Sequence, residues 1–95
     1  VSTEAPSSLP ELRLAVVPNP VVSGTPVGLK ITGGSYLPCT VSINDALGRL
    51  RHREHFLQMP DEHQFDANLK PGLYYIQVQN EQSVVSVPFV VHQRP

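Results

Sequence analysis

The sequence has no tryptophan, few tyrosines and phenylalanines and a single cysteine, and such scarcities exclude certain structures and functions. A lone cysteine, Cys39, cannot form an internal disulfide, and next to Pro38 we interpret it as a small buried or half-buried hydrophobe. No apolar run approaches the ~20 residues that a membrane-spanning helix needs. The net charge of −1 predicts no general electrostatic affinity for nucleic acid or acidic lipid.

Long helices are also excluded, because ten prolines and six glycines are spread through the chain and a proline inside a helix costs ~3 kcal/mol. The length of 95 residues suits one domain. We expect a flexible linker over residues 1–10, which are small, polar and proline-bearing, and one folded domain over residues 11–95. The first residues lack a basic segment followed by an apolar one, so we expect no export signal within them.

What the sequence does contain is alternation, most clearly around the turn dipeptide Pro71-Gly72. After this turn Tyr74, Ile76 and Val78 share one face of a predicted strand. Before it, alternate apolar residues predict another strand over 65–69. Tyr74 is the first large inward residue after the corner, so its ring should fill the core and its hydroxyl should bond back to the corner backbone.

Five further segments show strand patterns, and turn signals separate them. They cover residues 12–17, 27–31, 41–44, 49–57 and 85–91. Seven short strands predict an all-β fold, a seven-stranded antiparallel immunoglobulin-like β-sandwich. Polar residues interrupt the segment 49–57 and Pro88 interrupts the last one, so we expect both at sheet edges or bulges. The predicted core residues are Leu29, Ile31, Val41, Ile43, Tyr74, Ile76 and Val78.

Two turns require glycine in particular. Asp45-Ala-Leu-Gly48 predicts a hairpin turn, in which Asp45 accepts backbone N–H bonds and Gly48 takes a positive φ. We expect a positive φ at Gly72 as well.

No motif for chemistry emerges, so we expect no catalytic, metal or cofactor site and no enzyme activity. His52 and His55 are three residues apart on a predicted strand and therefore point to opposite faces. His63 and His92 stand alone, and Asp61 and Glu62 are neighbours in a turn rather than a pair across a cleft. The sequence has neither a GxSxG elbow nor a phosphate-binding loop.

Four pieces in a fixed order resemble one known family. They are Val17-Pro18-Asn19-Pro20-Val21, Asp45-Ala-Leu-Gly48-Arg49-Leu50, the segment 69–78 (LKPGLYYIQV) and Phe89-Val-Val91. Together they resemble the C-terminal sorting domains of the bacterial type IX secretion system, over residues 12–95. The matching positions are Pro18, Asn19, Pro20, Asp45, Gly48, Gly72, Tyr74, Phe89 and Val91.

The resemblance implies a secretion signal with a sandwich fold. Such a domain follows a cargo in the same chain, and the cargo travels through the periplasm to the outer-membrane translocon and on to the cell surface or the medium. The implied partners are translocon and sortase components, with no nucleic acid and with dimerisation through edge strands left open. A surface sortase would cleave within Ala5, Pro6, Ser7 and Ser8. Members commonly carry lysines in the last strand and tail, whereas Arg94 is the one basic residue here, so a domain retained in the secretion machinery is the other outcome.

Two other classes of binding module remain as alternatives. Leu69-Lys-Pro-Gly72 followed by a tyrosine also resembles a fibronectin-type-III corner, but there the tyrosine would fall at Tyr75, and no tryptophan is present. A carbohydrate-binding module would need an exposed aromatic platform, for which only Tyr36 and Tyr75 are candidates.

Overall fold

Eight β-strands in two sheets make up the computed structural model, which describes residues 12–33, 38–66, 68–81 and 83–93. The strands are β1 (Arg13–Val17), β2 (Val21–Val22), β3 (Val27–Thr32), β4 (Cys39–Asp45), β5 (Leu50–Phe56), β6 (Glu62–Phe65), β7 (Gly72–Gln79) and β8 (Val84–His92). Within these residues no helix has the length and apolar character needed to cross a membrane.

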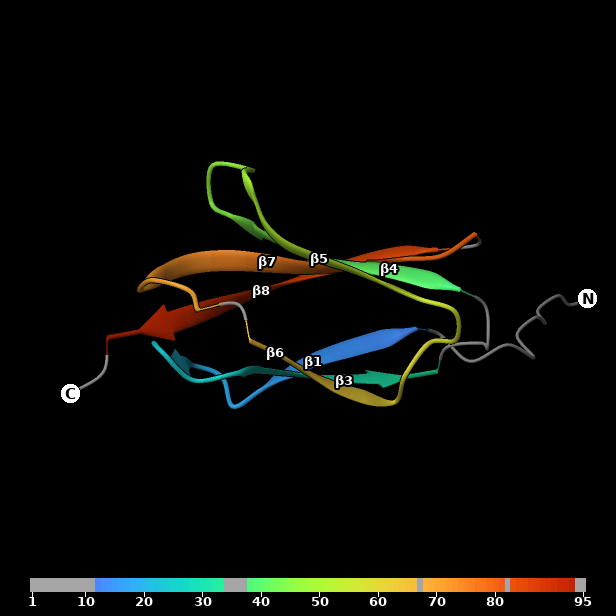
Figure 1. The fold of residues 1–95 in the computed structure, drawn as a ribbon, viewed down its shortest axis with the longest axis horizontal. Coiled ribbons are helices and arrows are strands. Elements are labelled where there is room, and N and C mark those ends of the chain that lie inside the picture. The colour runs from blue at the N-terminus through green and yellow to red at the C-terminus, as the bar shows by residue number, and fades with distance from the viewer. Residues whose placement is uncertain (1–11, 34–37, 67, 82, 94–95) are drawn as a thin grey trace, which may run out of the picture.

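The two sheets face each other as two layers (Figure 1). One has the strand order β1-β3-β6, and the other has the order β2-β8-β7-β4-β5. Neighbouring strands are antiparallel throughout, except that β2 pairs parallel with the end of β8, Val21 opposite Val91. β1 and β2 are consecutive in the chain but lie in different sheets, so Pro18-Asn19-Pro20 carries the chain from one layer to the other.

Apolar side chains from both sheets form one core between the layers. Alternation explains their selection, because successive residues of a strand point to opposite faces. In β7 the buried residues are Tyr74, Ile76 and Val78. All seven predicted core residues are buried, and Phe65, Phe89, Val21 and Val27 are the fully buried residues that join them.

The predicted count of seven strands is wrong, because Val21–Val22 forms an additional strand. Two residues are too few to show alternation, so no strand signal is visible there in the sequence. Their pairing partner, the end of β8, lies about seventy positions further along the chain. The parallel pairing of β2 with β8 also makes the second sheet mixed rather than purely antiparallel.

The strand predicted over 65–69 is also misplaced, since β6 ends at Phe65. Leu69 is buried as the alternation required, but it lies outside any strand. Asn68 has a positive φ of 51°, a left-handed conformation that ends an extended segment. Ala67, which completed the predicted alternation, lies outside the described residues.

Other local predictions are confirmed. β5 is an edge strand, and its register shifts opposite Ile43 and Asn44, which leaves Arg51 unpaired in a bulge. Gly48 and Gly72 have φ values of +84° and +151°. Cys39 is buried as a free thiol, and this burial raises the pKa of its thiol group.

Candidate functional site

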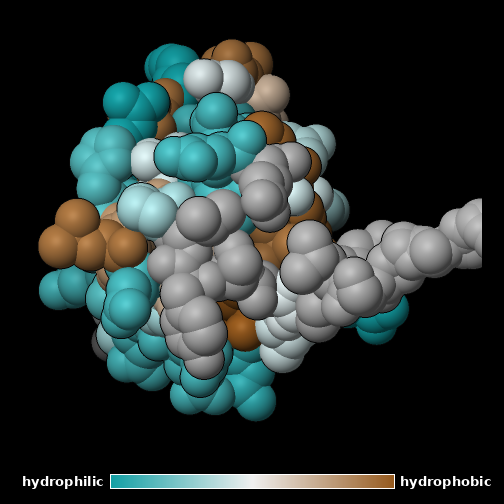
Figure 2. All heavy atoms as spheres, turned by 90° about the vertical axis from the view of Figure 1, so that its right-hand side faces the viewer, coloured by the Kyte–Doolittle hydropathy of each residue, from teal (hydrophilic) through white to brown (hydrophobic). Residues whose placement is uncertain are grey.

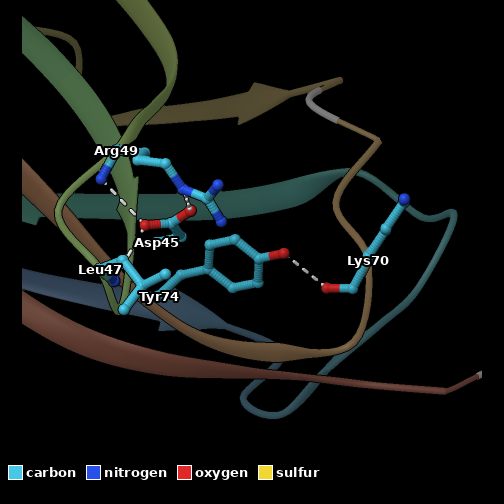
Figure 3. Close-up of polar contacts among 5 residues, drawn as sticks. All are labelled: Asp45, Leu47, Arg49, Lys70 and Tyr74. Atoms are coloured by element: carbon cyan, nitrogen blue, oxygen red, sulfur yellow. Dashed lines mark hydrogen bonds and ion pairs between the residues drawn. The ribbon is translucent and has the colours of Figure 1, made fainter.

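The turn between β4 and β5 is built around the Asp45 carboxylate. Its Oδ1 accepts the backbone N–H groups of Leu47 at 3.0 Å and Arg49 at 2.9 Å, and its Oδ2 accepts the Arg49 Nε–H at 2.9 Å (Figure 3). The Gly48 N–H donates to the Asp45 carbonyl at 2.9 Å, which closes the turn. The backbone N–H of Arg49 contributes most to a lowered pKa of the Asp45 carboxyl, which therefore stays ionised in this turn.

The corner before β7 is fixed by Tyr74. Its hydroxyl donates to the Lys70 carbonyl at 2.7 Å, as the sequence predicted (Figure 3). Its ring stacks on Phe89 with the centroids 5.7 Å apart. Tyr74 also stands opposite Asp45 in the β4–β7 pairing. The corner, the β4–β5 turn and the last strand are therefore connected through this one residue, by its side chain and its backbone pairing.

The end of β8 completes the arrangement. Val91 stands between Gly72 of β7 and Val21 of β2. Just beyond it, the Ser23 N–H donates to the His92 carbonyl at 2.7 Å. Asn19 accepts a long bond of 3.5 Å from the Val90 N–H.

All nine predicted motif residues thus lie at one end of the two-layered fold, which we call the motif end. It comprises residues 17–23, the turn 45–50, the corner 69–74 and residues 89–92. Figure 1 shows the β4–β5 turn rising from the same end at which β8 terminates. β1 begins at the opposite end, where the surface not covered by grey residues is mainly hydrophilic (Figure 2).

The motif residues divide into two groups by exposure. Tyr74, Phe89 and Val91 are buried and build the core, so they cannot touch a partner directly. The exposed residues of the motif are Pro18, Asn19, Pro20, Gly48 and Gly72, and Asp45, the ninth, is half-buried. The predicted cleavage residues Ala5, Pro6, Ser7 and Ser8 lie outside the described residues.

One cluster of polar side chains had no sequence signal. Glu54 of β5 contacts His52 through one carboxylate oxygen at 2.9 Å and His63 of β6 through the other at 3.3 Å. His63 comes from the other sheet, so the cluster links the two layers at the edge strands β5 and β6. In the part of the chain that the structure describes, no group of three His, Cys, Asp or Glu side chains is placed to hold a metal ion.

A groove of about 830 Å³ lies on the outer face of the larger sheet and bears on the carbohydrate-binding alternative. Its lining mixes apolar residues with polar ones, among them Thr40, Arg53 and Gln77. Tyr75 is exposed on β7 but does not line the groove, and Tyr36 lies outside the described residues. The groove has Phe56 in its lining, but neither of the two tyrosines predicted for a sugar-binding platform is placed there by the described residues.

These features place the protein in a class, the two-sheet β domains, and its motif residues build one end of the fold. Comparison with known families then matches residues 15–92 to the secretion system C-terminal sorting domain. The chain belongs to this family, the sorting domains of the type IX secretion system.

Among solved structures, a similar fold occurs in PorZ of Porphyromonas gingivalis, described as an essential bacterial surface component of the type-IX secretion system. The TM-score is 0.67 and the sequence identity 21%, over 83% of this chain. The match spans only 11% of the PorZ chain, so the likeness concerns one domain of a much longer protein. No curated protein matches this sequence.

Proposed function

We propose that this domain is a secretion signal that the type IX translocon reads in its folded state, at the motif end. The observation that carries the proposal is the convergence of nine family-motif residues, dispersed from Pro18 to Val91 in the sequence, at one end of the fold. The buried members hold the shape of this end, and the exposed members present it. β1 begins at the opposite end, so a cargo that precedes it would leave the motif end accessible.

In this proposal the cargo crosses the periplasm, and the translocon moves it to the cell surface. A sortase then removes the domain within residues 5–8, or the domain is retained in a component of the machinery. We further infer that the two layers are an immunoglobulin-like sandwich, because strand-order mixing between layers and a tyrosine corner are typical of that fold. Among the described residues, β5 and the part of β8 before Val91 each have one side without a partner strand, and these edges are available for dimerisation.

The test is a fusion of the 95-residue chain behind a passive periplasmic reporter that has its own signal peptide. In a bacterium with the type IX machinery, the reporter should become accessible to protease on intact cells. The same fusion in a strain without the translocon should remain periplasmic. Equal surface exposure in both strains, or no export in either, would contradict the proposal.

A matched pair of truncations tests whether export needs the intact motif end. Removing residues 93–95 leaves His92 and its bond to Ser23 in place, whereas removing residues 90–95 deletes Val91 and the pairing with β2. The shorter truncation should leave the domain folded, and the longer one should abolish export because the motif end is lost. Export by the longer truncation would show that the folded end is not what the translocon reads.

A further inference from the structure

A hollow of about 460 Å³ opens at the motif end, between the β4–β5 turn and the corner before β7. Its walls include Asp45, Arg49 and Arg51 on one side and Lys70 and Tyr74 on the other. In Figure 3 the Tyr74 side chain lies between Arg49 and Lys70. The hollow is therefore formed by the same two segments that carry the most distinctive motif residues.

Charge is concentrated at this hollow. The described residues contain equal numbers of Lys plus Arg and of Asp plus Glu, yet the hollow is lined by three cations and one acid. The acid, Asp45, is already engaged by Arg49. Among the described residues no ion pair is formed by Arg51 or Lys70, whereas Lys30 on β3 is paired with Glu62. The hollow thus carries a local positive charge on a chain whose net charge is −1.

The Arg49 side chain is preorganised to bind a ligand. Asp45 holds its Nε at 2.9 Å, which fixes the direction of a side chain that is otherwise mostly exposed. A guanidinium has five N–H donors, so its terminal nitrogens remain available for a second carboxylate. Such a fixed fork loses less conformational entropy on binding than a free side chain would.

Exposed apolar residues line the same hollow. Leu47 in the turn is 79% exposed and Leu73 at the start of β7 is 42% exposed. Apolar side chains next to unpaired cations fit a ligand that carries both carboxylates and apolar groups.

From these observations we propose that the hollow binds an acidic segment of a partner protein, an extended chain in which Asp or Glu alternates with apolar residues. The inference rests on the proposed function, and the partner would be a component of the translocon. Charge complementarity favours this occupant, because carboxylates would neutralise Arg51 and Lys70 and share Arg49 with Asp45. Three cations at one hollow are too local for the backbone of a nucleic acid, whose binding typically uses an extended basic surface.

The test is an NMR titration of the ¹⁵N-labelled 95-residue chain with the peptide acetyl-Asp-Leu-Glu-Leu-Asp-amide. The amide signals of Leu47, Arg49 and Leu73 should shift, and raising the salt concentration to 0.5 M should weaken binding. The control peptide acetyl-Asn-Leu-Gln-Leu-Asn-amide has the same shape without charge and should bind at least tenfold more weakly.

Two triple variants with equal net charge locate the site. The first is Arg49→Gln, Arg51→Gln and Lys70→Gln; the second is Arg13→Gln, Lys30→Gln and Arg53→Gln, at exposed cations outside the hollow. Each exposed ion pair should contribute a factor of about 1.5 to 5, so the first variant should bind about tenfold more weakly and the second less than twofold. The double variant Arg51→Gln and Lys70→Gln spares the Asp45–Arg49 turn and should lose roughly threefold to fivefold.

Several outcomes would overturn the inference: no shift near the hollow, equal losses in both triple variants, or binding to anionic phosphatidylglycerol vesicles but not to the peptide. The reporter fusion separates this inference from the proposed function. If the wild-type fusion is exported and the first triple variant is exported equally well, the acidic-segment inference fails and the secretion function stands. If the wild-type fusion itself is not exported, the proposed function fails whatever the peptide does.

Discussion

Tyr74 links core and corner at the scale of a single residue, since it is 5% exposed, stacks on Phe89 and donates to the Lys70 carbonyl. We predict that Tyr74→Ala lowers the free energy of unfolding by about 3–5 kcal/mol, as truncation of a large aromatic core side chain does. Tyr74→Phe keeps the ring and loses one hydrogen bond, so it should cost about 0.5–1.5 kcal/mol. Urea unfolding of the three proteins measures both values, and equal losses in the two variants would contradict the division between ring and hydroxyl.

Asp45 predicts a pH dependence. Its pKa lies below the ordinary 3.8 in the folded protein, chiefly through the Arg49 backbone N–H. A carboxyl with a depressed folded pKa contributes stability above its unfolded pKa, and this contribution is lost as the pH falls through the folded pKa. The wild type should therefore lose stability below about pH 4 more steeply than Asp45→Asn does.

Denaturation series from pH 6 to pH 2 measure this difference, and the ¹³C shift of the Asp45 carboxyl carbon gives its titration directly. Parallel curves for wild type and Asp45→Asn would show that the turn does not depend on the ionised carboxylate.

At the scale of the element, Gly28 in β3 shows a constraint that alternation does not reveal. A Cβ at this position would lie 2.3 Å from the Val17 carbonyl oxygen, which belongs to the backbone of the paired strand β1 and cannot simply rotate away. We predict that Gly28→Ala lowers the free energy of unfolding by about 1–3 kcal/mol, as overpacking does. Thr32→Ala, at an exposed position of the same strand, should change it by less than about 0.5 kcal/mol. Thermal unfolding compares the two, and similar effects would mean that β1 can move aside.

The sequence predicted an element well wherever one face of a strand carried regular apolar residues. The segments around Leu29, Ile43 and Ile76 are examples, and each corresponds to an observed strand. β2 was missed because its two residues depend on a distant partner, and the strand before the corner was misplaced because Asn68 turns the chain.

The residues of the candidate site were predicted from the sequence, but their convergence at one end of the fold was not. The motif pieces were visible in the sequence, yet their meeting at one end depends on pairings such as Gly72 with Val91 and Val91 with Val21. These contacts are long in sequence separation and have no local signature. The cluster of His52, Glu54 and His63 went unpredicted for the same reason, because β5 and β6 belong to different sheets. The absence of enzyme activity stays a prediction.

At the scale of the whole molecule, the stability of the fold depends on the end of β8, which pairs with both β7 and β2. Val91 is 2% exposed and joins β7 to β2. We predict that deleting residues 90–95 removes about 3 kcal/mol or more from a total stability of ~5–15 kcal/mol, whereas deleting residues 93–95 changes it by less than about 0.5 kcal/mol. Denaturation and amide exchange distinguish these outcomes. A stable domain after the longer deletion would mean that β2 does not depend on its pairing with β8.

The directions of β1 and β8 have a mechanical consequence. β1 runs toward the motif end from Arg13, and β8 runs toward the same end and finishes at His92. A pull on the chain before β1, opposed by a grip on the motif end, would load both strands along their lengths. The antiparallel hydrogen bonds that hold β1 to β3 and β8 to β7 lie perpendicular to the strands. Tension would therefore load each strand pair in shear. Its hydrogen bonds would bear the force together instead of breaking one after another. A domain loaded in shear resists mechanical unfolding, so it would stay folded while it transmits a pulling force to an attached cargo.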